Sequence, residues 1–301
     1  MISDVDMLCK LGKIKYQLMK TDPLRFFVRA FMAGAYLGLA AILSYTLGAL
    51  LSDHSVVGKI AVAGTFGIGL VAIIYLGAEL FTGNCFVTIM PVLKKKLKVR
   101  DILPMWITCY IGNMVGIAFI CFLFIKGGSQ EAIMTPYLKG IMEAKLHFNA
   151  VELLIRGILC NFIVCVAAYS GVKVKDDTAK LIIVMILVMT FVLPGFEHCV
   201  ANGGIFAMGM TQLGNTVDWS LMPLHMLLST IGNIIGGSVL LAVPVYMMFK
   251  APKEKNMWYR FTCFLLDKFY SLSNFRIEMM ICILAKKAFY FIVAMFFKND
   301  I

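Results

Sequence analysis

The sequence is poor in charge. Only 15% of its 301 residues are Asp, Glu, Lys or Arg, whereas 60% are hydrophobic. A soluble domain typically carries about 25% charged residues and 45–50% apolar residues. With a mean hydropathy of +0.86, this composition excludes a soluble enzyme and a disordered protein. The long apolar stretches instead predict an integral membrane protein of the cell membrane.

Acidic residues are especially scarce, 17 against 28 basic ones, which gives a net charge of +11. In a soluble protein this balance would suggest nucleic acid, but here the basic residues alternate with apolar stretches. They gather before residue 30, in 94–100, in 173–180 and after Phe249, whereas 52–55 and 211–223 contain none. Cytoplasmic loops of membrane proteins are enriched in Lys and Arg. The pattern predicts six spans with both termini in the cytoplasm, contacts with membrane lipid, and no nucleic-acid partner.

Sequence signals for metals, cofactors and export are also lacking. The nine cysteines form no CxxC pair and no Cys/His metal spacing, so we expect reduced cysteines and no metal site. No nucleotide-binding motif is present, and we expect no cofactor. The first 20 or so residues lack the apolar core and cleavage site of a signal peptide, so the N-terminus is expected to remain attached.

Apolar runs near the length of about 20 residues needed to cross a membrane define an all-α membrane protein. We expect a cytoplasmic amphipathic segment at 1–24, a six-helix transporter or channel domain at 25–250, and a basic cytoplasmic tail at 251–301 that can form an amphipathic helix on anionic lipid. The second and fifth runs are too long for simple spans and carry glycine or proline near their middles. The expected spans are Phe26–Leu51, Val56–Met90, Ile102–Ile125, Ala150–Val172, Leu181–Met210 and Leu224–Phe249.

The two interrupted spans share a motif, G-x-E-x-x-x-x-N, at 77–84 and again 118 residues later at 195–202. The tripeptide Ile-Gly-Asn at 111–113 recurs 120 residues later at 231–233. Spans one to three therefore repeat as spans four to six. Because three is odd, the second copy must be inverted in the membrane, an arrangement typical of transporters whose substrate site lies at the helix breaks.

Helix breaks at membrane depth survive only inside protein or beside water. The half-helices that follow such breaks present free N–H groups and positive dipole ends, which favour anions. A glutamate occurs at the same place in both motifs, Glu79 and Glu197. A carboxylate in the lumen would repel an anion, so we expect both to brace the unwound segments instead.

The segments 22–39, LFTGN at 80–84, 156–169 and GFEHCVAN at 195–202 together resemble the formate/nitrite transporter family. The resemblance covers roughly residues 21–250, and the context of Lys145 and Arg156 is closer to the nitrite and hydrosulfide branches. It implies an aquaporin-like inverted 3+3 repeat with broken helices 2 and 5. It also implies a homopentamer with one pore per protomer that passes small monovalent anions of weak acids, such as formate, nitrite or hydrosulfide.

The resemblance further implies roles for single residues. It assigns the substrate pathway to His198, Thr82, Lys145, Asn161 and Asn202. It assigns hydrophobic constrictions to Phe66, Leu70, Leu80, Phe81, Val164 and Phe191. It matches Glu152 to a polar position of the fourth span, and we group Glu152 with Glu79 and Glu197 as structural polar residues. Pro194 stands where many members carry a small residue, next to a constriction.

Two other functions remain open at this point. A neutral-solute pore of the aquaporin type would carry paired NPA motifs, but Asn84 is followed by Cys85 and Asn202 by Gly203. A membrane enzyme would have to use His198 with its neighbours in the chain, and adjacent residues rarely converge on one substrate. We therefore expect a non-enzymatic anion pathway in which protonation assists passage, because the neutral acid crosses an apolar region at lower cost than the anion.

Overall fold

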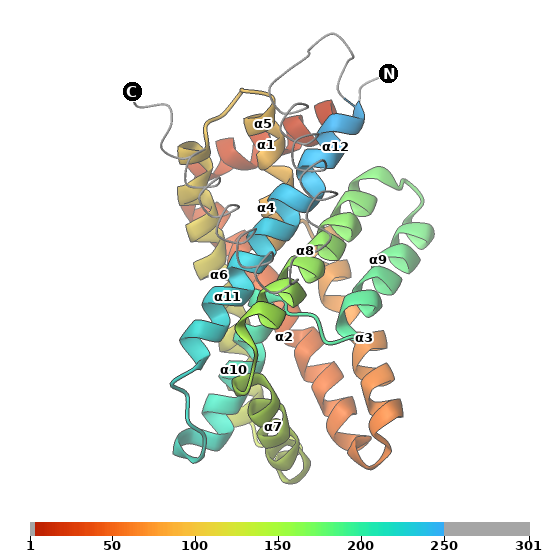
Figure 1. The fold of residues 1–301 in the computed structure, drawn as a ribbon, viewed down its shortest axis with the longest axis vertical. Helices are drawn as coiled ribbons and strands as arrows, with labels where there is room; N and C mark the ends of the chain where they lie inside the picture. The colour runs from red at the N-terminus through yellow and green to blue at the C-terminus, as the bar shows by residue number, and fades with distance from the viewer. Residues whose placement is uncertain (1–3, 250–301) are drawn as a thin grey trace, which may run out of the picture.

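The computed structural model describes residues 4–249, and all regular elements in this range are helices (Figure 1). The first repeat comprises α2 (Pro23–Leu50), α3 (Ser55–Tyr75), α4 (Phe81–Val87), α5 (Ile89–Leu93) and α6 (Val99–Lys126). The second comprises α8 (Ala150–Lys173), α9 (Asp177–Val192), α10 (Cys199–Leu213), α11 (Met222–Ile235), a π-helical turn (Gly236–Leu241) and α12 (Ala242–Phe249). The tail expected at 251–301 lies outside the described residues.

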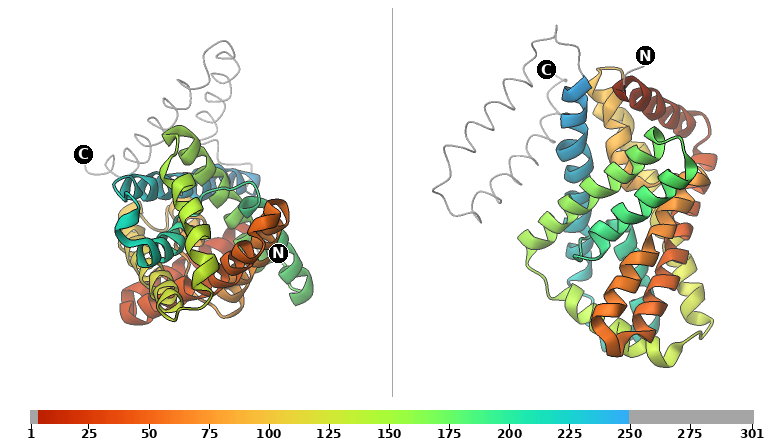
Figure 2. Two further views of the ribbon diagram at one scale, coloured as in Figure 1. Left: turned by 90° about the horizontal axis from the view of Figure 1, so that it is seen from below. Right: turned by 90° about the vertical axis from the view of Figure 1, so that its right-hand side faces the viewer.

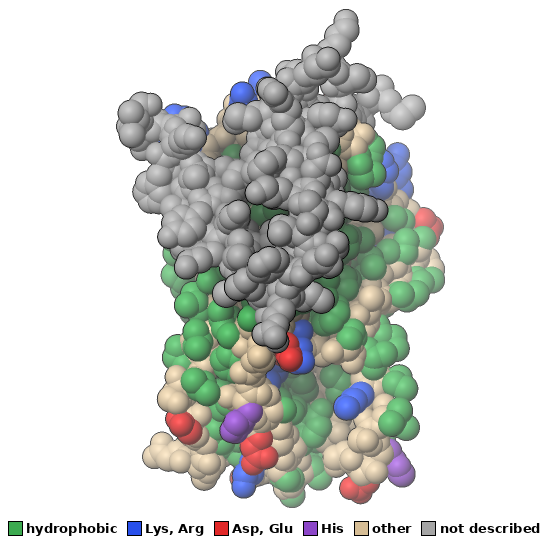
Figure 3. All heavy atoms as spheres, viewed as in Figure 1, with side chains coloured by type: hydrophobic (Ala, Val, Ile, Leu, Met, Phe, Trp, Pro, Cys, Tyr) green, Lys and Arg blue, Asp and Glu red, His purple; other side chains and the backbone are tan. Residues whose placement is uncertain are grey.

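Five segments of the described range are long and apolar enough to cross a membrane: Pro23–Leu50, Ser52–Tyr75, Val99–Lys126, Ala150–Lys173 and Met222–Phe249. The fifth expected span is divided between α9 and α10, of 16 and 15 residues, and neither is long enough alone. Hydrophobic side chains cover most of the described surface seen in Figure 3. The expected all-α membrane fold is thus confirmed, including the breaks in the second and fifth spans.

Both breaks turn on a glycine in the left-handed region of the backbone. Gly77, after α3, has φ of +68°, and Gly195, after α9, has φ of +75°. A side chain makes this conformation unfavourable, so glycine is the residue that ends each half-helix there. The chain then runs extended for a few residues before α4 and α10 begin.

A helix that the sequence analysis treated as a loop, α7 (Glu131–Leu146), precedes the second repeat. One residue per turn of this helix is buried, at Met134, Leu138, Met142 and Leu146, and the helix packs against α10 and α2. The residues that precede the first repeat likewise form a helix, α1 (Asp4–Thr21), which packs against α5 and α2 at the opposite end of the molecule (Figures 1 and 2). The short interfacial helices therefore belong to the repeat as well.

Acidic residues hold the start of α1 to the rest of the molecule. Asp4 accepts hydrogen bonds from Lys173 and from the hydroxyl of Tyr169, and Asp6 pairs with Lys94. The bond from the Lys173 ammonium, followed by that from Tyr169, holds the pKa of Asp4 below its ordinary value. These contacts fix α1 against the ends of α5 and α8.

The sixth span departs from α-helical geometry in its middle, where Gly236–Leu241 forms the π-helical turn. The wider turn places Ser238 so that its hydroxyl donates to the carbonyl oxygen of Cys85 in α4, at 2.8 Å. Short π-helical segments of this kind occur frequently at functional sites. The third span, which corresponds to it in the first repeat, is α-helical throughout.

Small residues let the third helix of each repeat touch the first. A Cβ atom added to Gly116 in α6 would lie 2.0 Å from the carbonyl oxygen of Phe31 in α2, and one added to Gly236 would lie 2.2 Å from that of Ile158 in α8. These glycines stand at equivalent positions, each four residues after another glycine, as in the GxxxG motifs of packed membrane helices. Backbone contact between α2 and α6 and between α8 and α11 depends on them.

We therefore expect Gly116→Ala and Gly236→Ala each to lower stability by about 1–3 kcal/mol or more, because the added methyl overlaps backbone that cannot move freely. The midpoint of thermal unfolding in detergent measures the effect. Gly140→Ala is the matched control, because nothing lies within 4 Å of its added Cβ. Equal stability of all three variants would show that the helices can separate at no cost.

Candidate functional site

An asparagine clamps the first break. Asn113, in α6, accepts a hydrogen bond from the backbone N–H of Phe81 at 2.8 Å. Its amide group donates to the carbonyl oxygens of Ala30, at 2.7 Å, and Glu79, at 2.9 Å. One buried side chain thus satisfies the N-terminal N–H of α4 and ties the unwound segment to α2, which matters because backbone polar groups at this depth have no water to bond.

Asn233 in α11 repeats this clamp at the second break. It accepts from the N–H of Cys199 at 2.9 Å and donates to the carbonyl oxygens of Gly157 and Glu197, both at 2.8 Å. The sequence motif shared by residues 111–113 and 231–233 therefore has a structural reason. Its asparagine holds the break, and its glycine permits close helix packing.

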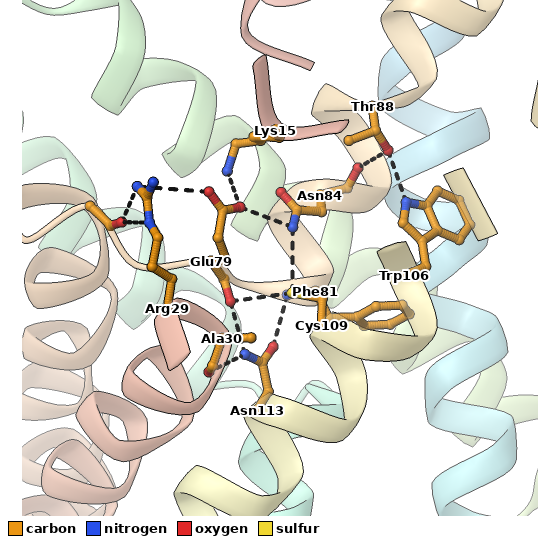
Figure 4. A network of polar contacts seen from close by, with 11 residues as sticks. Lys15, Arg29, Ala30, Glu79, Phe81, Asn84, Thr88, Trp106, Cys109 and Asn113 are labelled. Atoms are coloured by element: carbon orange, nitrogen blue, oxygen red, sulfur yellow. Dashed lines mark hydrogen bonds and ion pairs between the residues drawn. The ribbon is translucent and has the colours of Figure 1, made fainter. Parts of the chain in front are cut away.

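A glutamate with a lysine beside it lies next to each break. Glu79 is 2% exposed, and its carboxylate accepts from Nζ of Lys15 in α1 at 2.5 Å and from the amide of Asn84 at 3.2 Å (Figure 4). The guanidinium of Arg29 is 3.9 Å away and also donates to the carbonyl oxygen of Gly77, with Nε at 2.9 Å. We call these charged groups, Lys15, Arg29 and Glu79, the Glu79 cluster.

The corresponding group at the other end, the Glu197 cluster, consists of Glu197, Lys145 and His225. Nζ of Lys145, in α7, is 2.7 Å from the Glu197 carboxylate and donates to Oδ1 of Asn202 at 3.0 Å. The cluster lines a cavity of about 70 Å³ that opens between α7, α8 and α11. The side chain of Lys145 is therefore half-buried in an ion pair with Glu197 and does not extend freely into solvent.

His198 lies at the start of α10, buried between the two breaks. Its Nδ1 accepts a hydrogen bond from the N–H of Ala201 at 3.1 Å, and its Nε2 is 3.0 Å from the hydroxyl of Thr82 in α4. A backbone N–H can only donate, so Nδ1 carries no proton in this arrangement. The proton of the neutral ring is therefore on Nε2 and faces Thr82.

A small cavity of about 10 Å³ lies beside His198, about enough for one water molecule. Most of its wall is apolar, and it brings together six of the residues expected at the constrictions or on the substrate pathway with two others, Leu37 and Val188. Leu80 and His198 occupy equivalent places in the two repeats, so the repeats differ at this point in polarity. The lining residues are Leu37, Phe66, Leu70, Leu80, Val164, Val188, Phe191 and His198.

Phe81, expected at a constriction, and Asn161, expected on the substrate pathway, do not line this cavity. The ring of Phe81 faces away from the cavity and packs edge-on against Trp106 and Tyr110. The amide of Asn161 donates to the carbonyl oxygens of Thr82, at 3.2 Å, and Asn233, at 2.6 Å, so it joins the two half-sites. Both residues contact the machinery around the cavity without lining it.

The carboxylate of Glu152 is exposed and pairs with Arg156 one turn later, at 3.3 Å. Sequence reasoning missed the roles of Lys15, Asn113, Asn233 and His225. Asn113 and Asn233 could have been found from the repeat itself, because it places an asparagine on the third span of each copy. Lys15 could not, since it stands 130 residues before Lys145 and the helix that carries Lys145 was not expected. His225 has no such counterpart and carries no signal in the sequence.

The arrangement consists of an apolar cavity with the buried Thr82–His198 hydrogen-bonding pair beside it, and of a charged cluster next to each helix break. No group of three metal-binding side chains occurs among residues 4–249. The contacts of His198 place one hydroxyl, that of Thr82, within hydrogen-bonding distance of its ring.

Comparison with known proteins gives a consistent result. A family model described as "Formate/nitrite transporter" matches residues 5–247. The "Nitrite transporter NirC" of Salmonella typhimurium is 32% identical over 243 residues, which cover 79% of this chain and 88% of the relative. The "Formate-nitrite transporter" of Plasmodium falciparum is 30% identical over 244 residues, covering 75% and 78%.

Solved structures agree with the sequence comparison. A chain described as an "FNT family ion channel" superposes with a TM-score of 0.76 at 28% identity, covering 82% of this chain and 99% of the other. A "Pentameric formate channel with formate bound" superposes with a TM-score of 0.61 at 23% identity, covering 75% and 96%. The second likeness is one of fold.

The contacts of Glu79 predict a stability effect. Removing one partner of a buried ion pair costs about 3–5 kcal/mol of stability. Lys15→Met should cost about 3 kcal/mol, the lower end of this range, because Arg29 and Asn84 still contact the Glu79 carboxylate. The double variant Lys15→Met/Glu79→Gln should recover most of the loss, since no charge is then left unpaired. The thermal midpoint in detergent reports both, with Lys13→Met on the exposed face of α1 as the control. A double variant no better than Lys15→Met would contradict the pairing.

Proposed function

The chain belongs to the formate/nitrite transporter family, and we propose that it passes small monovalent anions of weak acids through one pore in each protomer of a homopentamer. It is a channel or transporter of a multi-pass membrane protein family. Formate, nitrite and hydrosulfide are the proposed substrates, and the context of Lys145 favours nitrite and hydrosulfide. The observation that carries the proposal is the apolar cavity beside His198, together with a buried lysine–glutamate pair at each helix break.

The proposed orientation places α1 in the cytoplasm and α7 on the outer side of the cell membrane. The charge bias supports it, because the basic run at 94–100 and the end of α8 lie at the α1 end, whereas the α7 end has few basic residues. We infer on the same basis that 251–301 is a cytoplasmic tail. The Glu79 cluster is then the inner entrance and the Glu197 cluster the outer one.

We propose that the lysine at each entrance raises the local anion concentration. At the outer entrance Lys145 is held by Glu197 and Asn202 at a fixed place near the start of α10. An anion arriving there meets the cavity bounded by Phe66, Leu70, Val164 and Phe191, which offers it no charge. Because an anion is costly in such a wall and its conjugate acid is not, passage requires a proton from outside the cavity.

His198 acts in this scheme as a hydrogen-bond donor. Its Nδ1 accepts from Ala201, so a proton added there would face another N–H and the cap of α10 would be lost. The remaining proton, on Nε2, is directed at Thr82, whose own hydroxyl hydrogen can then be donated to the solute. This geometry favours hydrogen bonding over proton exchange at His198.

The test of the function is a flux panel in liposomes. Formate, nitrite and hydrosulfide should enter protein-containing vesicles faster than empty ones, and faster still when the outside is more acidic than the inside. Glycerol at the same osmolarity should enter both kinds of vesicle at the same rate, as followed by light scattering. Glycerol entry as fast as formate entry would identify a neutral-solute pore instead.

The role of His198 predicts different outcomes for two substitutions. His198→Phe removes both the cap and the donor, so formate flux should fall by about 10-fold or more, in line with the loss of a buried hydrogen bond of about 1–3 kcal/mol. His198→Asn keeps an acceptor for Ala201 and a donor for Thr82, so flux and its pH dependence should both resemble the unaltered protein. Asn carries no titratable proton, and a pH dependence that vanishes in this variant would mean that His198 exchanges protons. Size-exclusion chromatography checks that both variants assemble.

A further inference from the structure

His225 is a buried histidine without a hydrogen-bond partner. It lies on α11, is 1% exposed, and neither of its ring nitrogens makes a hydrogen bond within residues 4–249. The rings of Phe148 and Phe206 stand edge-on to it, with centroids 5.3 and 5.2 Å away, and fix its position. Its Nε2 is 3.7 Å from the carboxylate of Glu197, too far for a hydrogen bond. Buried polar atoms normally have a partner, so this ring needs an explanation.

The unpartnered ring borders the cavity of about 70 Å³ at the Glu197 cluster. This space is large enough for a water-sized or slightly larger molecule. Lys145 and Glu197 line it beside His225, as does the ion pair of Arg156 with Glu152, so a guest there would lie among cations, carboxylates and an imidazole. A molecule bound in the cavity can therefore supply the hydrogen-bond partner that the His225 ring lacks.

The two entrance clusters differ in one respect. Glu79 has two permanent cations beside it, Lys15 at 2.5 Å and Arg29 at 3.9 Å. Glu197 has one permanent cation, Lys145, and the second place is taken by His225. With a neutral imidazole the Glu197 cluster has no net charge, whereas the Glu79 cluster carries one positive charge.

Among residues 4–249, Lys145 is the one permanent cation paired with Glu197. Arg156, the counterpart of Arg29 on α8, also lines the cavity, but its guanidinium pairs with Glu152 at 3.3 Å. The described parts of α4 and α10 carry no charged residue. His147, which follows α7 and also lines the cavity, is exposed, with Nδ1 2.8 Å from the carbonyl oxygen of Glu143. It is the second titratable group that a test must separate from His225.

We propose that this cavity binds a small monovalent anion together with one proton, and that His225 takes up the proton. An anion placed beside Lys145 adds a negative charge to a neutral cluster and so favours the protonated ring. The imidazolium can then donate one N–H toward Glu197 and the other to the anion. The proton comes from the external water and no covalent bond changes. By linkage, acid strengthens anion binding as much as the anion strengthens proton binding.

The proposal rests on the proposed function, since the anion is of the class that the pore would pass. It adds a residue that determines how the outer entrance responds to pH. A permanent cation, as at the inner entrance, would hold an anion equally well at all external pH values. A histidine there restricts tight binding to conditions in which a proton is available to accompany the anion.

External nitrate tests the proposal in cells that express the protein. Nitrate is the base of a strong acid and stays an anion throughout, so any pH dependence of its binding belongs to the protein. Its inhibition constant is measured against uptake of labelled formate, kept well below saturation, between external pH 7.5 and 4.5. In the unaltered protein the constant should fall toward the limit of about 10-fold per pH unit for one linked proton.

His225→Gln keeps a polar side chain without a titratable proton, so its nitrate inhibition constant should not change with pH. His225→Asn serves the same purpose if the glutamine variant does not assemble. His54→Gln, an exposed histidine of the loop between α2 and α3, is the matched control and should keep the slope. A slope that persists in the His225 variants, or one abolished by His147→Gln alone, overturns the proposal. A flat response in the unaltered protein overturns it as well, and absence of any formate uptake would instead reject the proposed function.

Discussion

The structure depends on satisfying the backbone at two helix breaks that lie at membrane depth. In lipid an unpaired N–H or carbonyl group costs several kcal/mol, so a break is possible only where protein supplies partners. Asn113 and Asn233 supply them, each with one acceptor and two donors used. The close packing of α6 on α2 and of α11 on α8 follows from this constraint, because the asparagines reach the breaks only when the helices touch.

Because the two halves are repeats, an equivalent asparagine satisfies the backbone at each break. The residues that bear on function are those at which the two halves differ. Leu80 and His198 are the N-cap residues of α4 and α10 at equivalent positions, so the wall of the central cavity has a leucine from one repeat and an imidazole from the other. Arg29 and His225 are the second partners of the two buried glutamates. The two repeats share their helix arrangement and their breaks. The two differences between them place a histidine beside each cavity, His198 at the smaller one and His225 at the larger one.

The spans, their breaks and the repeat could be predicted from the sequence, because hydropathy and the spacing of Gly, Glu and Asn depend on local chain properties. The helix α7 could not be recognised from hydropathy, since its buried residues recur only once per turn and the segment is too polar to span a membrane. The direction of Phe81 and the bridging role of Asn161 depend on packing between distant segments. The likeness to a known family suggested pore roles for both, but it did not indicate which side chains would face the cavity.

The charged clusters and the apolar cavity favour different protonation states of the solute. A lysine at each mouth favours the anion, while a cavity of about 10 Å³ with a mostly apolar wall favours the neutral acid. A solute that satisfies both must change its charge between the mouth and the centre, so the proton has to join it before the constriction. His198 is poorly placed for this transfer, because its Nδ1 already caps α10 and its Nε2 faces Thr82. The proposed scheme therefore has the proton join the anion in the wider cavity of about 70 Å³ beside Glu197. The neutral acid then needs only hydrogen bonds at the centre, and a buried donor pair is sufficient to supply them.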